Sequence, residues 1–236
     1  MRSSEGPSLR DLAVQVLSSV ERGYDLLAPR FDRTPYRTSD RLLDATAEAL
    51  RAYGPFGDGL DVCCGTGAGM RVLKPLCRGR IAGVDFSAGM LDEAREAYPD
   101  AELVRADVRA LPFVGEFDLA VSFGAFGHFL PAERPTFFAG VHRALRPGGL
   151  FAFPVAAPPR VTSRWYWRLA GFDALMRLRN AVWRPPFVMY YRTFPLEAVR
   201  ADLAAVGFGV ATVALEDYGR REDGSPRCRL VLARRA

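Results

Sequence analysis

The sequence predicts an α/β fold, in which helices cover a mostly parallel sheet that ends in an antiparallel hairpin. Three observations support it: short apolar runs bounded by turn residues, amphipathic stretches between most of them, and two final runs separated only by a turn-rich linker. Strands that alternate with helices require crossover connections, which favour a parallel sheet. Two runs joined by a turn-rich linker favour an antiparallel pair.

The expected strands are the apolar runs 59–64, 80–85, 102–105, 117–122, 150–155, 209–216 and 227–234. The expected helices, which show helical spacing of apolar residues or lie between these runs, are 8–22, 38–52, 67–76, 87–97, 132–145 and 195–206. A chain of 236 residues can bury one well-formed core. We therefore expect a single domain with four parts: N-terminal helices (1–55), a core (56–155), a helical, aromatic insert that forms a cap (156–194), and a C-terminal helix and hairpin (195–236).

Composition limits the compartment and the partners. No apolar run approaches the roughly 20 residues of a membrane-spanning helix, and the first ten residues lack the apolar stretch of a secretory signal. We therefore expect a cytoplasmic protein without a transmembrane segment. Almost all the positive charge is arginine, and the net charge of +5 is too small to indicate nucleic acid. We expect a small-molecule substrate and no nucleic acid, and a homodimer remains open.

The four cysteines and the acidic residues give no sign of a metal site. No two cysteines have the spacing of a zinc site, and Cys63 and Cys64 are adjacent, so we expect free thiols. No cluster of acids fits a divalent cation either. The sequence therefore predicts no bound metal.

The segment 60–69 (LDVCCGTGAG) joins the first expected strand to a helix. Its small residues allow a ligand to approach the backbone, and the helix that follows directs free N–H groups into the turn. Such a loop is also found in NAD and phosphate binders. A dinucleotide fingerprint needs the spacing Gly-x-Gly-x-x-Gly, whereas this loop has Gly65, Gly67 and Gly69. The NAD alternative is therefore weaker.

Two acids lie at or just beyond the ends of the next two expected strands. Asp85 ends the second one, eighteen residues beyond Gly67, where a carboxylate can accept both hydroxyl groups of a ribose. The alternative is a solvated acid that caps the next helix, a role for which Ser87 competes. Asp107 lies just past the third strand, where it could accept a hydrogen bond from an adenine amino group. The order and spacing of these acids favour a nucleoside-type ligand.

Four motifs in order, DVCCGTG at 61–67, GVDFSAGML at 83–91, ADV at 106–108 and LRPGG at 145–149, carry a family resemblance. Together they resemble the class I S-adenosylmethionine-dependent methyltransferases, and the first is similar to that of the ubiquinone/menaquinone-type and related small-molecule enzymes. The resemblance covers 40–155 well and 195–236 in outline. It implies a Rossmann-like fold with S-adenosyl-L-methionine as cofactor, and it makes 145–149 the turn into the fifth strand.

The resemblance also implies roles for single residues. Gly65 and Gly67 would let the backbone pass the methionine part of the cofactor, Asp61 would engage its amino group, and Asp85 would bind the ribose. Cys63 stands where many relatives have the first glycine, a departure common in the quinone-type subgroup. The other implied cofactor-binding residues flank the adenine, reach its edge, line the site or close it: Thr66, Phe86, Met90, Asp107, Val108, Phe123 and Tyr24.

The loop after the fourth expected strand, 122–129 (SFGAFGHF), is the candidate catalytic segment. Ligands of open parallel sheets bind beyond the carboxyl ends of the strands, so this loop should lie near the transferred methyl group. His128, with a usual pKa of about 6.5, is the candidate general base. The alternative is a histidine that packs the loop against the next helix. The loop lacks the Asn/Asp-Pro-Pro-aromatic sequence that resembles an amine-methylating site, which favours O- or C-methylation.

The insert 156–194 combines aromatic residues with seven arginines and a single acid, Asp173. This composition suits a lid over an aromatic, apolar or anionic small molecule. A nucleic-acid contact, a membrane interface and a plain helical cap remain open. The expected function is methyl transfer to O or C of a small, aromatic or apolar molecule; the alternatives are an RNA- or protein-directed methyltransferase and a non-catalytic cofactor-binding module. The aromatic residues are Trp165, Tyr166, Trp167, Phe172, Trp183, Phe187, Tyr190, Tyr191 and Phe194.

Overall fold

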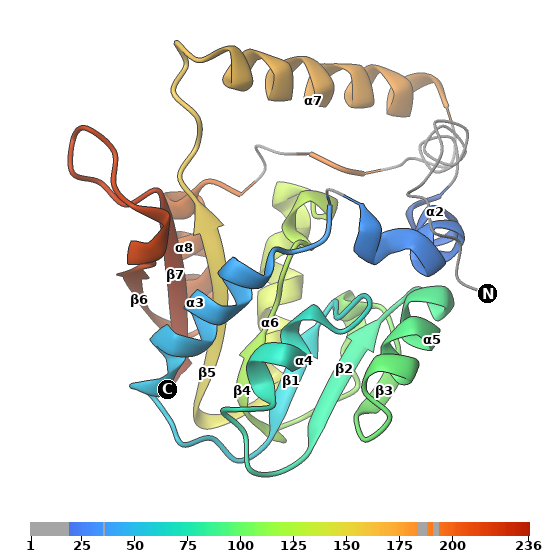
Figure 1. The fold of residues 1–236 in the computed structure, drawn as a ribbon, viewed down its shortest axis with the longest axis vertical. Helices are drawn as coiled ribbons and strands as arrows, with labels where there is room; N and C mark the ends of the chain where they lie inside the picture. The colour runs from blue at the N-terminus through green and yellow to red at the C-terminus, as the bar shows by residue number, and fades with distance from the viewer. Residues whose placement is uncertain (1–18, 35, 184–187, 191–193) are drawn as a thin grey trace.

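The computed structural model describes residues 19–34, 36–183, 188–190 and 194–236. Their centre is a sheet with the strand order β3-β2-β1-β4-β5-β7-β6 (Figure 1). The first five strands of the chain are parallel, and β7 pairs antiparallel with both β5 and β6. The predicted fold class, including the C-terminal hairpin, is confirmed. The strands are β1 Gly59–Val62, β2 Ile81–Asp85, β3 Glu102–Arg105, β4 Phe117–Val121, β5 Leu145–Ala156, β6 Phe208–Ala214 and β7 Cys228–Arg235.

Helices cover both faces of this sheet. Apolar side chains of α3 and α4 join one buried cluster, and those of α6 and α8 join the cluster on the other face. The helices are α2 Val20–Leu27, α3 Asp40–Arg51, α4 Ala68–Leu73, α5 Ala88–Ala97, α6 Arg134–Ala144, α7 Arg164–Val182 and α8 Leu196–Ala205. Short 3-10 helices are η1 Ala28–Arg33, η2 Val108–Ala110, η3 Phe126–His128, η4 Pro131–Glu133 and η5 Glu216–Tyr218.

Strand β5 shows why the sheet needs two covering layers. Phe151 and Phe153 point into the α6/α8 cluster, while Leu150 and Ala152 point into the α3/α4 cluster. Successive side chains of a strand alternate between the two faces, so a strand that is apolar at every position must be buried on both. The continuous apolar run 150–155 therefore marks a central strand.

Several boundaries differ from the expected ones. β1 ends at Val62 instead of residue 64, because Cys63 turns the chain with a left-handed φ of 58°. β5 begins at Leu145, so that 145–149 is an irregular start of the strand rather than a turn before it; the pairing register with β4 shifts there, and Gly148 has a φ of 79°. Residues 8–18 of the first expected helix lie outside the described residues, and α2 continues past the expected end at 22.

Two segments lie at the carboxyl ends of the parallel strands. The N-terminal elements α2 and η1 pack on α5, and α7 of the insert crosses above the sheet on that side (Figure 1). The insert thus contains the expected helix. In the described part of the chain, no helix combines the length and the apolar character needed to cross a membrane.

Candidate active site

The glycine-rich loop turns sharply between β1 and α4. Its backbone has left-handed φ angles of 58° at Cys63, 52° at Gly65 and 98° at Gly67, which is the N-cap of α4. A left-handed φ is unfavourable for any residue with a side chain and favourable for glycine, so glycine is the residue expected in place of Cys63. A side chain at Gly69 would begin 2.3 Å from a carboxyl oxygen of Asp61. Gly69 therefore leaves the space that the Asp61 carboxyl group occupies.

Asp61 is a buried acid without a partner. Its side chain is 1% exposed, and neither carboxyl oxygen has a hydrogen-bond partner among the described residues. Burial raises the pKa of Asp61 to about 8, and the nearby Asp85 carboxylate adds to this. An unpaired buried acid is costly, and a cationic donor offsets that cost. The amino group of a methionine moiety is such a donor, so Asp61 fits the role implied for it.

Asp85 is held at the tip of β2 by two backbone groups. One carboxyl oxygen accepts a hydrogen bond from Gly65 N and the other from Ser87 N, both at 2.9 Å. Ser87 caps α5 by accepting a hydrogen bond from Met90 N at 3.2 Å. Burial raises the pKa of Asp85, and its backbone hydrogen bonds act against this. Because Ser87 takes the capping role, the second lone pair of each Asp85 oxygen remains suited to a ribose hydroxyl.

The adenine side of the expected site contains an ion pair that the sequence did not indicate. Asp107 accepts hydrogen bonds from the backbone N–H of Arg109 at 2.9 Å and from its guanidinium at 2.6 Å. Arg109 lowers the pKa of Asp107 and also pairs with Glu133 at 2.7 Å. Asp107 is therefore ionised and fixed in place at the end of β3. Val108 is part of the main buried cluster, so any contact it makes with adenine involves its backbone.

Three other expected cofactor residues differ in burial. Met90 is 1% exposed and Phe123 is 7% exposed, and Phe123 belongs to the cluster on the α3/α4 face. Phe86 is partly exposed, and its backbone carbonyl accepts a hydrogen bond from Arg105. Only Phe86 of these three presents a sizeable free side-chain surface.

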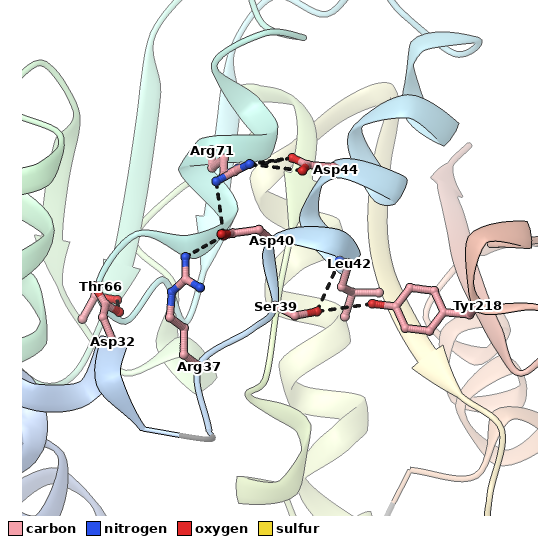
Figure 2. A network of polar contacts seen from close by, with 9 residues as sticks. All are labelled: Asp32, Arg37, Ser39, Asp40, Leu42, Asp44, Thr66, Arg71 and Tyr218. Carbon is pink, nitrogen blue, oxygen red and sulfur yellow. Dashed lines mark hydrogen bonds and ion pairs between the residues drawn. The ribbon is translucent and has the colours of Figure 1, made fainter. Parts of the chain in front are cut away.

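Thr66 contacts the N-terminal segment. Its hydroxyl group donates a hydrogen bond to Asp32 at 2.8 Å (Figure 2). A chain of ion pairs continues nearby: Arg71 of α4 lies 3.2 Å from Asp40 and 2.9 Å from Asp44, both on α3. These contacts fix η1 and α3 against the glycine loop and α4. Asp32 was not identified from the sequence, where it is one acid among many in a loop.

A second acid of the N-terminal segment, Asp25, contacts the start of α5. Asp25 on α2 accepts hydrogen bonds from Ser87 Oγ at 2.6 Å and from Gly89 N at 3.0 Å. It thereby joins α2 to the start of α5, two residues beyond Asp85. Asp25 too was missed, because nothing local to it marks a partner more than 60 residues away.

His128 is bonded at both ring nitrogens. Its Nδ1 lies 2.7 Å from the carbonyl oxygen of Val188, and its Nε2 lies 2.7 Å from the hydroxyl oxygen of Tyr24. A carbonyl only accepts, so Nδ1 carries the proton and the neutral ring accepts the Tyr24 hydroxyl proton at Nε2. Burial lowers the pKa of His128, and the Val188 carbonyl acts against this. The structure thus places Tyr24 and His128 together, which the sequence analysis did not foresee.

The insert lies on the loop that carries His128. Tyr190 N donates a hydrogen bond to Gly127 O at 2.7 Å, and Tyr190 is 5% exposed. Its ring packs with Met176 of α7, and its hydroxyl accepts a hydrogen bond from Asn180 Nδ2 at 3.0 Å. The segment 188–190 therefore separates α7 from the His128 loop. Two of the nine aromatic residues of the insert, Phe187 and Tyr191, lie outside the described residues.

The comparisons with known proteins agree with this fold. The DhpI–SAH complex is 20% identical to the chain, with a TM-score of 0.64 over 97% of this chain and 99% of that one, which shows a common fold. Residues 60–149 match the family model described as a methyltransferase domain. Residues 60–149 therefore resemble a methyltransferase domain, and the described residues share the Rossmann-like fold of the DhpI–SAH complex.

Two curated relatives show which methyltransferases the chain resembles. A trans-aconitate 2-methyltransferase of Azoarcus is 34% identical over 58% of this chain and 58% of its own length. A 2-phytyl-1,4-naphtoquinone methyltransferase of Thermosynechococcus vestitus is 27% identical over 64% of this chain and 72% of its own length. The chain spans about six tenths of the length of this trans-aconitate relative and of an uncharacterized methyltransferase of Synechocystis.

Proposed function

We propose that this chain transfers a methyl group from S-adenosylmethionine to an oxygen or carbon atom of a small, aromatic or apolar molecule bound under the insert. The observation that carries the proposal is the 2.7 Å contact between the Tyr24 hydroxyl and His128 Nε2, in the loop after β4 and beneath segment 188–190. A neutral histidine that faces a tyrosine hydroxyl can hold the proton that an acceptor molecule must lose.

The residues around the glycine loop suit the cofactor. Asp61 would bind the amino group, Asp85 the ribose, and the backbone from Gly65 to Gly67 the methionine part; Asp107 would meet the adenine. The bound cofactor supplies an electrophilic methyl group next to a positively charged sulfur. The chain itself contributes position and charge: Asp85 fixes Gly65 N, and the buried Asp61 provides an acceptor that water does not reach.

The Tyr24–His128 pair provides a route for the proton of the acceptor. An acceptor hydroxyl or acidic C–H would give its proton to Tyr24 Oη, while the Tyr24 proton moves to His128 Nε2. The ring then becomes a cation whose Nδ1–H remains bonded to the carbonyl of Val188. Atoms and charge balance in this step, because the proton lost by the acceptor equals the one gained by the histidine. Tyr24 is thus proposed to touch the acceptor, and His128 to hold the proton.

Aromatic side chains beside this pair support an aromatic or apolar acceptor. Phe126, two residues before His128, stacks on Phe194 at the end of the insert, with ring centroids 4.2 Å apart and an interplanar angle of 21°. Its ring also lies 4.7 Å from that of Phe153, which is fully buried in β5. Phe126 and Phe194 are only partly buried, and partly exposed aromatic rings favour planar apolar molecules. The naphthoquinone relative supports the same class, and the trans-aconitate relative supports small acids as the competing one.

The test is transfer of label from isotopically labelled S-adenosylmethionine. The purified chain would be incubated with separate panels of quinols, phenols, fatty acids and tricarboxylic acids, and products would be identified by mass spectrometry. We expect methylated quinols or phenols. Binding of the cofactor by calorimetry without transfer to any panel would instead assign the chain a binding role. Label that appears only in added RNA or protein would exclude a small-molecule acceptor.

A further inference from the structure

The helix α7 carries a continuous apolar strip on its solvent side. Trp167 is 66% exposed, Leu175 62%, Leu178 64% and Val182 78%. Positions 167, 175, 178 and 182 share one face of the helix, because at 3.6 residues per turn they lie within about 80° of one another around its axis. Between them on that face are small, exposed residues, namely Gly171, Ala174 and Ala181. We call the face made by these seven residues the outer face of α7.

The opposite side of α7 is already occupied. Met176 is 2% exposed and packs with Tyr190, and Phe172, Leu130 and Val20 pack against them. The helix is therefore apolar on both sides, whereas a helix with one free side normally carries polar residues there. A large exposed apolar surface on one element usually marks a docking site. We therefore expect the outer face to be covered by a partner whose own surface is at least partly apolar.

The charges around the outer face indicate what that occupant is. The insert 156–194 carries seven arginines in the sequence and one acid, Asp173, which is only 3% exposed. Arg164 and Arg168, both exposed, lie at the start of α7 on the same side as the outer face. Aromatic residues mark both ends, with Trp165 58% and Trp183 51% exposed. The surface thus offers cations, tryptophans and aliphatic side chains without an exposed carboxylate from the insert.

We propose that the outer face of α7 docks on the surface of an anionic lipid bilayer. Interfacial helices place an apolar face at the acyl boundary, tryptophans at the headgroup level and arginines against anionic headgroups. The length and polarity of α7 suit this position, because it is not apolar enough to span a bilayer.

A second copy of the chain fits the same surface less well. Pairing two outer faces would bring arginines from both copies together, with no exposed acid of the insert to pair with them. Charge therefore favours the bilayer.

Docking would place the candidate active site beside the membrane. The inner side of α7 contacts segment 188–190, which is hydrogen-bonded to the His128 loop through Tyr190 and Gly127. A molecule dissolved in the lipid would then reach the Tyr24–His128 pair without crossing water. This statement about the substrate rests on the proposed function, whereas docking itself is independent of any activity.

The experiment measures binding of the whole chain to vesicles. All three tryptophans of the chain, Trp165, Trp167 and Trp183, lie in or next to α7, so intrinsic tryptophan fluorescence reports on this helix alone. The probes are vesicles of phosphatidylcholine, pure or mixed with phosphatidylglycerol in a ratio of three to one. We expect a blue shift and co-flotation with the mixed vesicles, weaker co-flotation in high salt, and little with the neutral ones.

The variant Leu175→Asp/Leu178→Asp should weaken co-flotation at least tenfold. Val114→Asp is the matched control, because Val114 is equally exposed at 67% but precedes β4 at the amino end of the sheet; it should bind like the wild type. Should the double variant misfold, quenching of the wild-type tryptophans by brominated lipid replaces it. The proposal would be overturned if the double variant bound vesicles as well as Val114→Asp, or if brominated lipid left the tryptophan fluorescence unquenched. It would also be overturned if light scattering showed a dimer of the wild type that the double variant does not form. A chain that binds vesicles but methylates nothing refutes only the proposed function.

Discussion

The hydroxyl oxygen of Tyr24 lies 2.7 Å from Nε2 of His128, a residue 104 positions further along the chain. The rings meet edge to face, with centroids 5.3 Å apart and an interplanar angle of 81°. The carbonyl of Val188 fixes the other ring nitrogen and with it the tautomer. Three distant parts of the chain, namely α2, the loop after β4 and the insert, are thus joined at one imidazole.

The first prediction concerns Tyr24. Tyr24→Phe removes the hydroxyl group but keeps the ring, so it should lower kcat by about 100-fold, within the range for loss of a general acid–base group. The affinity for S-adenosylmethionine, measured by calorimetry, should change less than about threefold. Tyr53→Phe, at an exposed tyrosine beyond α3, serves as control. Wild-type kcat in Tyr24→Phe would remove the hydroxyl from the mechanism.

The second prediction is the pH dependence of turnover. Only the neutral His128 ring accepts a proton at Nε2, and burial holds the pKa of His128 below its ordinary value. Turnover should therefore stay constant down to a pH below about 6.5 and fall only at still lower pH. In His128→Ala, turnover should be low at every pH and this limb should be missing, while the cofactor still binds. A limb that persists in the variant would belong to another group.

The third prediction concerns the stability of the cofactor-free chain. Asp61 keeps its proton in the folded state up to a pH of about 8, whereas the unfolded acid loses it near its ordinary pKa of 3.8. The folded state binds more protons between these values, so rising pH destabilises it. Asp61→Asn removes this penalty and should raise Tm by a few degrees at pH 8 and by less at pH 5.

The same variant should bind the cofactor less tightly, because an amide does not replace an anionic acceptor for an amino group. We expect at least a tenfold loss of affinity in calorimetry, on the order of 1.4 kcal/mol. An unchanged Kd in Asp61→Asn would exclude Asp61 as the partner of the amino group, whatever happens to Tm.

The fourth prediction concerns the tip of β2. Asp85→Ala removes the acceptor for Gly65 N and Ser87 N and the expected ribose partner, so cofactor affinity should fall at least tenfold, on the order of 1.4 kcal/mol. Asp92→Ala, at an exposed acid on α5 that pairs only at the surface, is the control. Calorimetry on both variants checks the assignment, which an unaltered affinity of Asp85→Ala would refute.

The sequence predicted the sheet because its signals are local. Apolar runs, turn residues and helical spacing lie within ten residues or so of one another, and together they located every strand of the sheet. The glycine loop and Asp85 could be placed in the same way, because each lies at the end of an expected strand and therefore at the carboxyl edge of the sheet. Boundaries were less exact: Cys63 ends β1 early, and Leu145 starts β5 early, because backbone conformation at these two positions depends on the neighbouring strands.

The contacts that complete the site were decided by tertiary structure. Tyr24 meets His128, Asp32 meets Thr66, and Asp25 meets Ser87 across 104, 34 and 62 positions respectively. No pattern in the sequence encodes such pairs, because they result from the packing of α2 and η1 on the strand ends. Burial, which leaves Asp61 without a partner, likewise depends on all the layers around it. The sequence by itself determined the fold class and indicated the kind of cofactor, because both depend on local patterns, and tertiary packing decided which side chains meet at the candidate site and which face of α7 stays exposed.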